Sequence, residues 1–217
     1  GAIPGALTTA SFARSVSRTP IWLSAENPLA NHPWASDPNA ELPAKVDVVV
    51  VGAGFTGAAC AYHWSKRDSG VMAVLEMDDA ASGASGRNAG FVVMGRHFGR
   101  VKGTVMRHLH RARADLTPPQ RDRLASTFAA AYVRSAYKNA DLIEKTIREE
   151  GFDCGYAREG WIQGQTPEGQ VDLDESVRLG TEAGFDDWTK IEPGRALELG
   201  GIRLDCAAGF SKGAATW

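Results

Sequence analysis

The sequence KVDVVVVGAGFTGAACAYHWSK, residues 45–66, decides the fold of this chain. Its four consecutive valines, Val48 to Val51, predict a short β-strand of the kind that is covered on both faces in a parallel sheet. Gly52, Gly54 and Gly57 follow in G-x-G-x-x-G spacing, and a helical pattern begins directly after the first two. In this spacing the first glycine permits a tight turn, the second lets a pyrophosphate approach the backbone, and the third lets helix and strand pack closely. The stretch therefore predicts a strand, a turn and a helix that bind the phosphates of a dinucleotide.

A second apolar run, Val71 to Leu75, ends in Glu76, about 20 residues beyond the glycines. A carboxylate at this place can accept hydrogen bonds from both hydroxyls of an adenosine ribose, and it repels a 2′-phosphate. The glycine motif by itself is a weak signal, because 24 of the 217 residues are glycine. The alternative is an ordinary strand–turn–helix whose glycines serve only chain geometry. The acidic residue after the second strand favours the dinucleotide site.

The loop after this strand, MDDAASGASGRNAGFV, residues 77–92, narrows the choice of cofactor. Small side chains and hydroxyls crowd the loop, and Arg87 adds a fork of donors suited to phosphate oxygens. Such a loop can follow an extended cofactor and bond its phosphate, ribitol or ring oxygens through backbone N–H groups. The alternative is a solvated Gly/Ser turn with a surface arginine. The loop directly follows an apolar strand that ends in an acidic residue, as in Rossmann folds, and this place favours cofactor binding.

The pair VVVVGAGFTG and LEMDDAASGASGRNAGF resembles the D-amino-acid-oxidase-like flavoproteins, and ASGRNAG is most similar to the gamma-glutamylputrescine oxidoreductase branch of that family. The resemblance is strong over residues 22–93 and looser beyond them. It implies FAD as the cofactor. The loop has neither His nor Cys, so FAD is expected to be held non-covalently by this chain. The predicted cofactor-binding residues are Gly52, Gly54, Phe55, Thr56, Gly57, Glu76, Met77, Ser85, Gly86, Arg87, Asn88, Ala89 and Gly90.

The same resemblance implies an enzyme that oxidises the C–N bond of an amine or amino acid. Hydride passes from the carbon next to nitrogen to the flavin, and water hydrolyses the resulting imine. Oxygen is the expected electron acceptor, which gives hydrogen peroxide. The sequence assigns no catalytic residue, and His108 and His110 lack a third ligand, so no metal site is expected. Two alternatives stay open: an NAD-dependent dehydrogenase, and a non-catalytic FAD-binding subunit of a larger complex.

Composition and charge describe an ordinary globular protein. Apolar residues make up 43% and charged residues 23% of the chain. A net charge of −2 gives no reason to expect nucleic acid or a membrane as a partner, and no apolar run reaches membrane-spanning length. Three cysteines without C-x-x-C or metal-ligand spacing suit reduced thiols. An intracellular, cytoplasmic location is expected, while Arg14 and Arg18 leave import into an organelle open.

Three regions are expected along the chain. Residues 1–44 are interrupted by prolines and predict an N-terminal arm, anchored by Trp22 and Trp34. Residues 45–153 are expected to form a Rossmann-like FAD-binding region with a helical insertion. Residues 154–217 are expected to begin a substrate-binding domain.

Local signals place the elements within these regions. Thr117 before two prolines predicts the start of a helix that continues to Gly151. Cys60, on the helix after the glycines, is expected to be a small core residue. The last region is expected to contain a strand around Trp161, a helix at 168–183, a strand at 187–191 and a turn at 192–194.

The expected fold class is α/β: a Rossmann-like FAD-binding domain plus the start of an antiparallel α+β substrate domain, as part of a larger fold. No later strand returns to the parallel sheet, which predicts unpaired edges and an uncovered apolar face. The expected partners are a small amine or amino-acid substrate and a second polypeptide that completes the fold, with a further segment of the same protein as the alternative. Arg158, Trp161 and Arg203 are candidates for a substrate cavity, although packing or a surface role is the stronger expectation for each.

Overall fold

The computed structural model describes residues 19–24, 26–32, 37, 41–67, 70–94 and 98–216, so Trp34 and most of the predicted N-terminal arm lie outside the described residues. The chain forms two compact units, residues 1–89 and 90–217. The predicted functional boundary after residue 153 stays a prediction. Helices, a parallel strand pair and antiparallel strands together confirm the expected α/β class.

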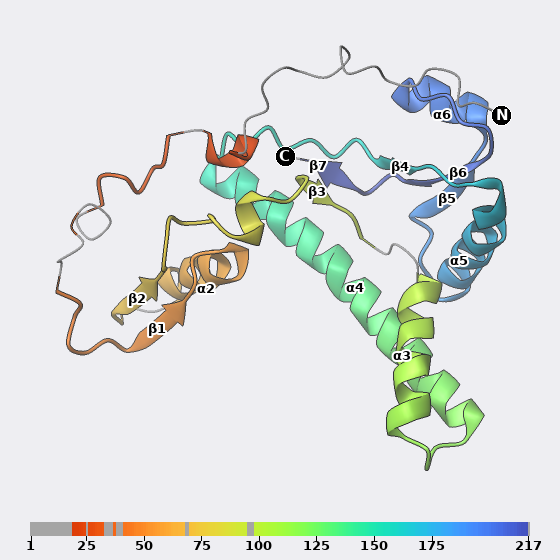
Figure 1. The fold of residues 1–217 in the computed structure, drawn as a ribbon, viewed down its shortest axis with the longest axis horizontal. Helices are drawn as coiled ribbons and strands as arrows, with labels where there is room; N and C mark the ends of the chain where they lie inside the picture. The colour runs from red at the N-terminus through yellow and green to blue at the C-terminus, as the bar shows by residue number, and fades with distance from the viewer. Residues whose placement is uncertain are drawn as a thin grey trace. The chain divides into compact units, whose positions relative to one another are not determined.

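The first unit is a β–α–β unit (Figure 1). Its two strands pair in parallel, with Val48 opposite Met72 and Val51 opposite Leu75, and the helix connects them. The predicted strand–turn–helix and the second strand are therefore confirmed. The elements are η2 (Ile21–Leu23), β1 (Val48–Val51), α2 (Phe55–Ser65), β2 (Met72–Leu75) and η3 (Ala84–Gly86).

One side of this unit is apolar and uncovered within the described residues. Val49 is 51% exposed, Val51 is 84% exposed and Val74 is 39% exposed. The prediction of a strand covered on both faces is therefore wrong for the described chain, whereas the expected uncovered face is observed. Cys60 is exposed on α2 and is not the core residue that its size predicts, because no described element covers that side of the helix.

The second unit begins with a short strand, β3 (Phe91–Val92), and a helical hairpin of α3 (Phe98–Ala112) and α4 (Pro118–Glu150) (Figure 1). The predicted helix up to Gly151 is confirmed. At its start, the backbone N–H of Thr117 donates to Oε1 of Gln120 at 2.8 Å. The two helices enclose a core cluster of Phe98, Ala129 and Val133.

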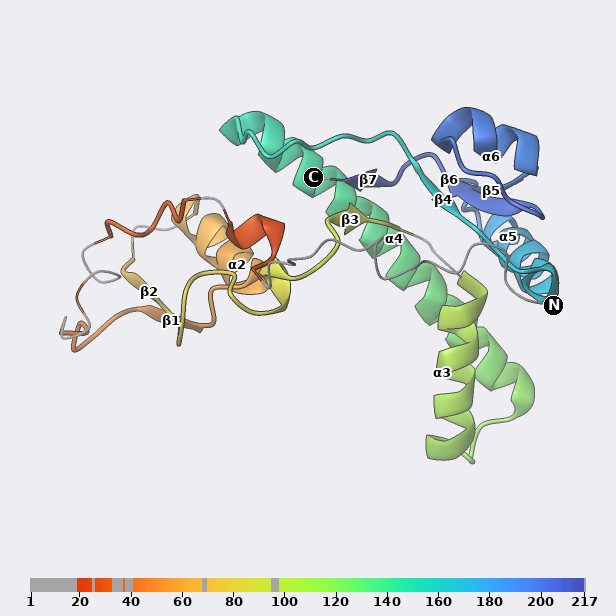
Figure 2. The same ribbon diagram turned by 45° about the horizontal axis from the view of Figure 1, so that its top comes forward.

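The remaining strands of the second unit are antiparallel (Figure 2). The strand β6 lies between β4 and β5, and β3 pairs with β7. Helix α5 packs on β5. The bounds are β4 (Trp161–Gln163), α5 (Gln170–Glu182), β5 (Trp188–Ile191), α6 (Pro193–Gly200), β6 (Ala208–Ser211) and β7 (Ala215–Thr216).

The turn predicted at 192–194 is wrong, because Pro193 is the first residue of helix α6. Proline fits the first position of a helix, where its missing N–H costs nothing and its fixed φ is already helical. Gly201, at φ 66, then ends the helix in the left-handed conformation. Pro193 and Gly201 are typical of the start and the end of a helix, so this helix is predictable from the sequence.

A polar cluster ties the sheet of the second unit to α4. Asp187 is 8% exposed and accepts hydrogen bonds from the backbone N–H of Gly213, at 2.8 Å, and from the hydroxyl of Ser211. The Nε of Arg158 donates to the Gly213 carbonyl at 2.8 Å, and its Nη1 pairs with Glu144 at 2.7 Å. The hydrogen bond to Glu144 raises the pKa of Arg158 above its ordinary value. These contacts favour the packing role of Arg158.

Among the described helices, none combines the length and the apolar character that crossing a bilayer requires.

Candidate cofactor site

Each glycine of the motif has its own steric reason in the structure. Gly52 has φ +98, a conformation that residues with a side chain rarely adopt. A Cβ on Gly57 would lie 1.9 Å from the carbonyl oxygen of Gly52, so α2 and the turn approach as closely as only glycine permits. A Cβ on Gly54 would lie 2.8 Å from Oγ of Ser85. The turn is therefore bare backbone at the N-terminus of α2.

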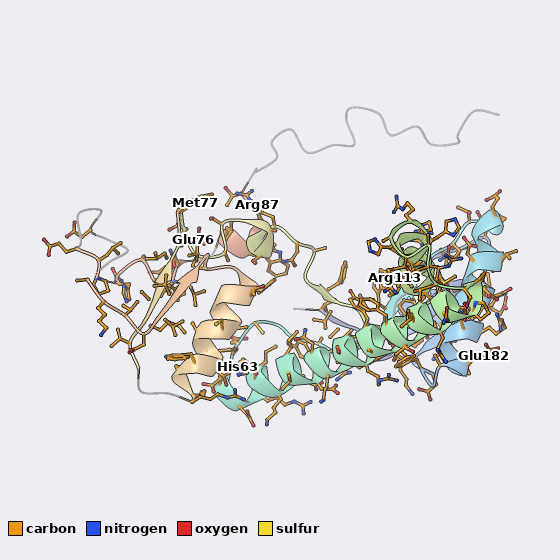
Figure 3. The ribbon with its side chains drawn as sticks, turned by 90° about the horizontal axis from the view of Figure 1, so that it is seen from below. His63, Glu76, Met77, Arg87, Arg113 and Glu182 are labelled. Atoms are coloured by element: carbon orange, nitrogen blue, oxygen red, sulfur yellow. The ribbon has the colours of Figure 1, made fainter. Side chains whose placement is uncertain are left out.

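Glu76 follows β2 directly (Figure 3), and its carboxylate reaches back to the glycine turn. The N–H of Ala53 donates to Oε2 at 2.6 Å, and the N–H of Met77 donates to Oε1 at 2.9 Å. These backbone donors, Ala53 foremost, hold the pKa of Glu76 below its ordinary value. The side chain is exposed, and each oxygen keeps a lone pair for a further donor such as a ribose hydroxyl.

The lowered pKa makes the contribution of Glu76 to stability depend on pH. A carboxyl group whose pKa is lower in the folded state stabilises that state fully above the unfolded-state pKa, and this stabilisation is lost as the pH falls through the folded-state value. We expect Glu76→Gln to destabilise the first unit at pH 7 and to match the wild type at strongly acid pH. Urea unfolding of both proteins at each pH measures the difference, with Asp78→Asn, the exposed neighbour, as the control. An equal difference at both pH values would show that the charge of Glu76 plays no part.

The loop after Glu76 folds back onto the glycine turn. The N–H of Ala81 donates to the carbonyl of Ala53 at 3.1 Å. The N–H of Phe55, the first residue of α2, donates to Oγ of Ser85 at 2.9 Å. Ser85 therefore lies at the N-terminus of α2, where the helix dipole and the unpaired N–H groups favour an anionic phosphate.

Side chains of the loop also fix its own backbone. The Nε of Arg87 donates to the carbonyl of Ser82 at 2.9 Å, and Nδ2 of Asn88 donates to the carbonyl of Ser85 at 2.5 Å. Arg87 is exposed, and its terminal nitrogens make no hydrogen bond to any other described residue. Gly86 is buried, and a Cβ there would lie 2.5 Å from the carbonyl of Ala81. The loop thus presents a guanidinium group from a fixed backbone.

The other predicted residues are placed as follows. Phe55 is 54% exposed and Met77 is 100% exposed, and Thr56 and Ala89 are exposed as well. Gly90 belongs to the second unit, where it is buried with φ 72. The other twelve predicted residues lie in the first unit, and the contacts of all thirteen with a cofactor stay predictions.

Sequence reasoning missed two alanines and a leucine. The N–H of Ala53 donates to Glu76, and its carbonyl accepts from the N–H of Ala81. Ala53 thus connects the glycine turn to the end of β2 and to the loop that follows. Ala81 has φ 62, the one positive φ outside glycine in the described chain. Leu23 packs over Gly86. No sequence pattern marks an alanine for such a place, because its backbone rather than its side chain makes the bonds.

These features suit the ADP half of FAD. A phosphate needs backbone N–H groups, a helix N-terminus and room close to the chain, and the bare turn before α2 provides all three. A ribose needs an acceptor at the end of the second strand, where Glu76 lies. In the described ranges, no three His, Cys, Asp or Glu side chains gather to hold a metal ion.

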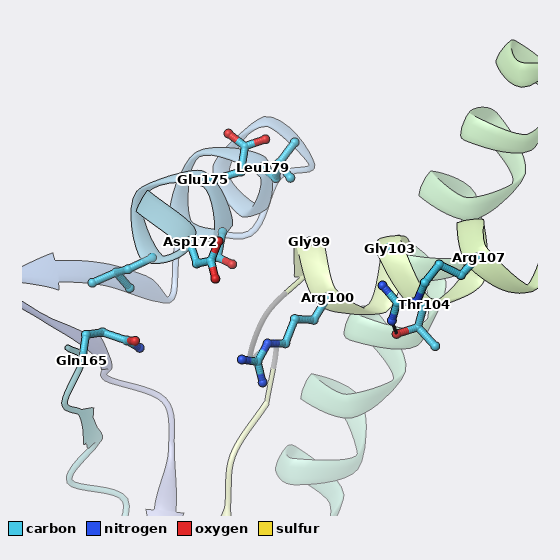
Figure 4. Close-up of a pocket in the computed structure, with 11 residues that line it drawn as sticks. Gly99, Arg100, Gly103, Thr104, Arg107, Gln165, Asp172, Glu175 and Leu179 are labelled. Carbon is cyan, nitrogen blue, oxygen red and sulfur yellow. Dashed lines mark hydrogen bonds between the residues drawn. The ribbon is translucent and has the colours of Figure 1, made fainter. Parts of the chain in front are cut away.

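The second unit has a separate, open pocket of about 560 Å³ between α3 and α5 (Figure 4). Arg100 and Arg107 line one wall, and Asp172 and Glu175 line the other. Two of these four charged side chains have other partners: Arg107 donates to Thr104 at 3.1 Å, and Glu175 pairs with Arg178 at 2.7 Å. The pocket is therefore a solvated groove between two charged helices.

The chain belongs to the FAD dependent oxidoreductase family named DAO, which matches residues 47–216. The cofactor of this family is FAD, in agreement with the glycine turn and with Glu76. No curated protein is similar enough in sequence to count as a relative.

Solved structures agree in fold. The L-proline dehydrogenase from P. horikoshii is 18% identical with a TM-score of 0.54, over 81% of this chain and 38% of its own. The L-amino acid deaminase from Proteus myxofaciens is 19% identical with a TM-score of 0.54, over 82% of this chain and 34% of its own. Glycine oxidase from Geobacillus kaustophilus is 22% identical with a TM-score of 0.50, over 79% and 40%. The chain thus spans less than half of each, and these identities establish the fold alone.

Proposed function

We propose that this chain is the FAD-binding part of an enzyme that oxidises the C–N bond of an amine or amino acid. The observation that carries the proposal is the glycine turn: Gly57 leaves no space for a Cβ beside Gly52, and Glu76 meets the same turn from the end of β2. This arrangement occurs in a chain of a family that uses FAD.

The residues of the first unit have distinct proposed tasks. The backbone from Gly52 to Gly57 receives the pyrophosphate at the N-terminus of α2, and Glu76 accepts hydrogen bonds from the ribose. Arg87 offers its terminal nitrogens to phosphate oxygens. The backbone from Ser85 to Ala89 follows the rest of the cofactor, which is held without a covalent bond. When bound, FAD supplies the acceptor for the hydride of the substrate, and oxygen is the proposed final acceptor.

The substrate class rests on two supports. The named structural relatives are a proline dehydrogenase, an amino acid deaminase and a glycine oxidase, all of them named for amino acids. The ASGRNAG segment, residues 84–90, favours the gamma-glutamylputrescine branch and hence an amine. We propose a primary or secondary amine, free or within an amino acid, as the substrate.

A further stretch of polypeptide completes the proposed enzyme. The uncovered valines of β1 and the exposed Val74 of β2 form an apolar surface of the kind that the interior of a sheet presents to a second layer. We propose that a second polypeptide, or more of the same one, covers it, and that the substrate-binding domain begins at residue 154.

The test is the visible absorption spectrum of the native protein with all chains that copurify. We expect two flavin bands that bleach when an amine or amino acid is added anaerobically. A flavin that never bleaches would support a non-catalytic FAD-binding subunit. A colourless protein that does not take up FAD but binds NAD would overturn the proposal. The variant Gly54→Val tests the site itself, because it places a side chain against Ser85 in the glycine turn. It should bind no flavin and be colourless.

A further inference from the structure

The short turn η2 lies against the loop that is proposed to hold FAD. The indole Nε1 of Trp22 donates a hydrogen bond to the backbone carbonyl of Asn88 at 2.7 Å. The two residues are 66 positions apart in the sequence, so this bond joins the N-terminal arm to the loop. Trp22 is 37% exposed, so the residue is partly covered.

Leu23, the next residue, makes a second contact with the same loop. A Cβ on Gly86 would lie 2.7 Å from Cδ2 and 3.0 Å from Cγ of Leu23, so the leucine side chain packs directly on the glycine backbone. The N–H of Gly86 donates to Ala81 at 2.8 Å, which closes the loop beneath the leucine. Ile21, in the same turn, is 74% exposed.

The loop that receives these two contacts bonds the start of α2 on its other side. Ser85 precedes Gly86, on which Leu23 packs, and its hydroxyl oxygen accepts a hydrogen bond from the N–H of Phe55. Its backbone carbonyl accepts a second hydrogen bond, from the side-chain amide of Asn88. Within one unit, the arm therefore contacts the loop, and the loop in turn bonds the first N–H of α2. A displacement of the arm would be transmitted to Ser85 and Asn88.

We propose that Trp22 and Leu23 are positioning residues for the cofactor loop: they hold residues 84–88 in the conformation that binds FAD. They act through the Asn88 carbonyl and the Gly86 backbone and do not touch the cofactor themselves. This inference rests on the proposed function, because the loop matters in this way only if FAD binds to it.

The test compares two aromatic substitutions of Trp22, one without and one with a ring N–H group. Trp22→Phe removes the donor, whereas Trp22→His keeps an N–H at the matching position of a five-membered ring. In the native protein with its copurifying chains, we expect Trp22→Phe to weaken FAD binding about 2- to 10-fold, as for the loss of one hydrogen bond. Trp22→His should recover part of this loss at a pH where its ring is neutral. Leu23→Ala should weaken binding as well, and Ile21→Ala should not.

A second readout needs no cofactor. Hydrogen exchange of the FAD-free protein should be faster in residues 81–88 of Trp22→Phe and Leu23→Ala than of the wild type and Ile21→Ala, with global unfolding unchanged. Faster exchange together with a wild type that does not bind FAD would overturn the proposed function and the positioning role, and would leave only an arm contact. A wild type that binds FAD, with equal affinity and equal exchange in Trp22→Phe and Ile21→Ala, would overturn the positioning role alone.

Discussion

Replacement of Gly57 by alanine should weaken FAD binding about 100-fold and loosen the β1–α2–β2 unit. A single methyl group at this position would lie 1.9 Å from the Gly52 carbonyl oxygen and 3.2 Å from a methyl carbon of Val50. Backbone cannot yield as a flexible side chain does, so α2 must move away from the turn. Overpacking typically costs about 1–3 kcal/mol, and a clash with backbone is expected at the upper end of this range, near about 3 kcal/mol. If that cost falls on the site, FAD affinity decreases by about 100-fold.

Absorbance of bound flavin and its affinity, measured by fluorescence titration, check this expectation. Gly83→Ala is the matched control, because it lies in the same unit at φ −78, and nothing lies within 4 Å of a Cβ there. It should bind FAD as the wild type does. Full FAD binding by Gly57→Ala would contradict the steric role assigned to this glycine.

Replacement of Asp187 by alanine is expected to give the largest loss of stability in the second unit. The change leaves the N–H of Gly213 and the hydroxyl of the fully buried Ser211 without their acceptor. Each unsatisfied buried donor costs about 1–3 kcal/mol, so the free energy of unfolding should fall by about 3 kcal/mol. The turn between β6 and β7 would also lose its bond to Asp187, which leaves the bond from Arg158 to the Gly213 carbonyl and the bond from the N–H of Gly160 to the Ala214 carbonyl.

Urea unfolding followed by near-ultraviolet circular dichroism measures this loss. The rings of Trp161 and Trp188 meet edge to face at 5.9 Å and report on the packing of this sheet. Asp186→Ala is the control, because this neighbouring carboxylate is exposed. Equal stability of the two variants would show that the cluster around Asp187 carries no net energy.

The sequence predicts the first unit well because its signals are local. Four valines, three glycines and one acid lie within 29 consecutive residues, 48–76, and each acts on its immediate neighbours. The long helix α4 is predictable for the same reason, since Thr117 and Gly151 mark its ends. Helix α6 is not predicted because Pro193 is compatible both with a turn and with the first position of a helix.

Contacts between distant segments lie beyond such reasoning. The bond from Phe55 to Ser85 spans 30 residues and the bond from Trp22 to Asn88 spans 66, and neither follows from a periodic pattern. One end of each bond is a backbone group, which every residue possesses, so the sequence does not show which residue the side chain at the other end will meet. The exposed Cys60 and the uncovered valines differ from expectation for another reason. Burial depends on which elements pack together, whereas the composition of a strand shows only that burial would be favourable.

The hydrogen bond from Ala53 to Glu76 has a consequence for the thermodynamics of cofactor binding. A glycine-rich turn loses more conformational entropy on ordering than other backbone, and a ligand that had to order it would bind more weakly for that reason. Here a carboxylate 23 residues away already fixes the turn through a backbone N–H at 2.6 Å. The entropy is therefore lost when the chain folds, and the phosphates of the proposed cofactor would meet a turn that is already in place.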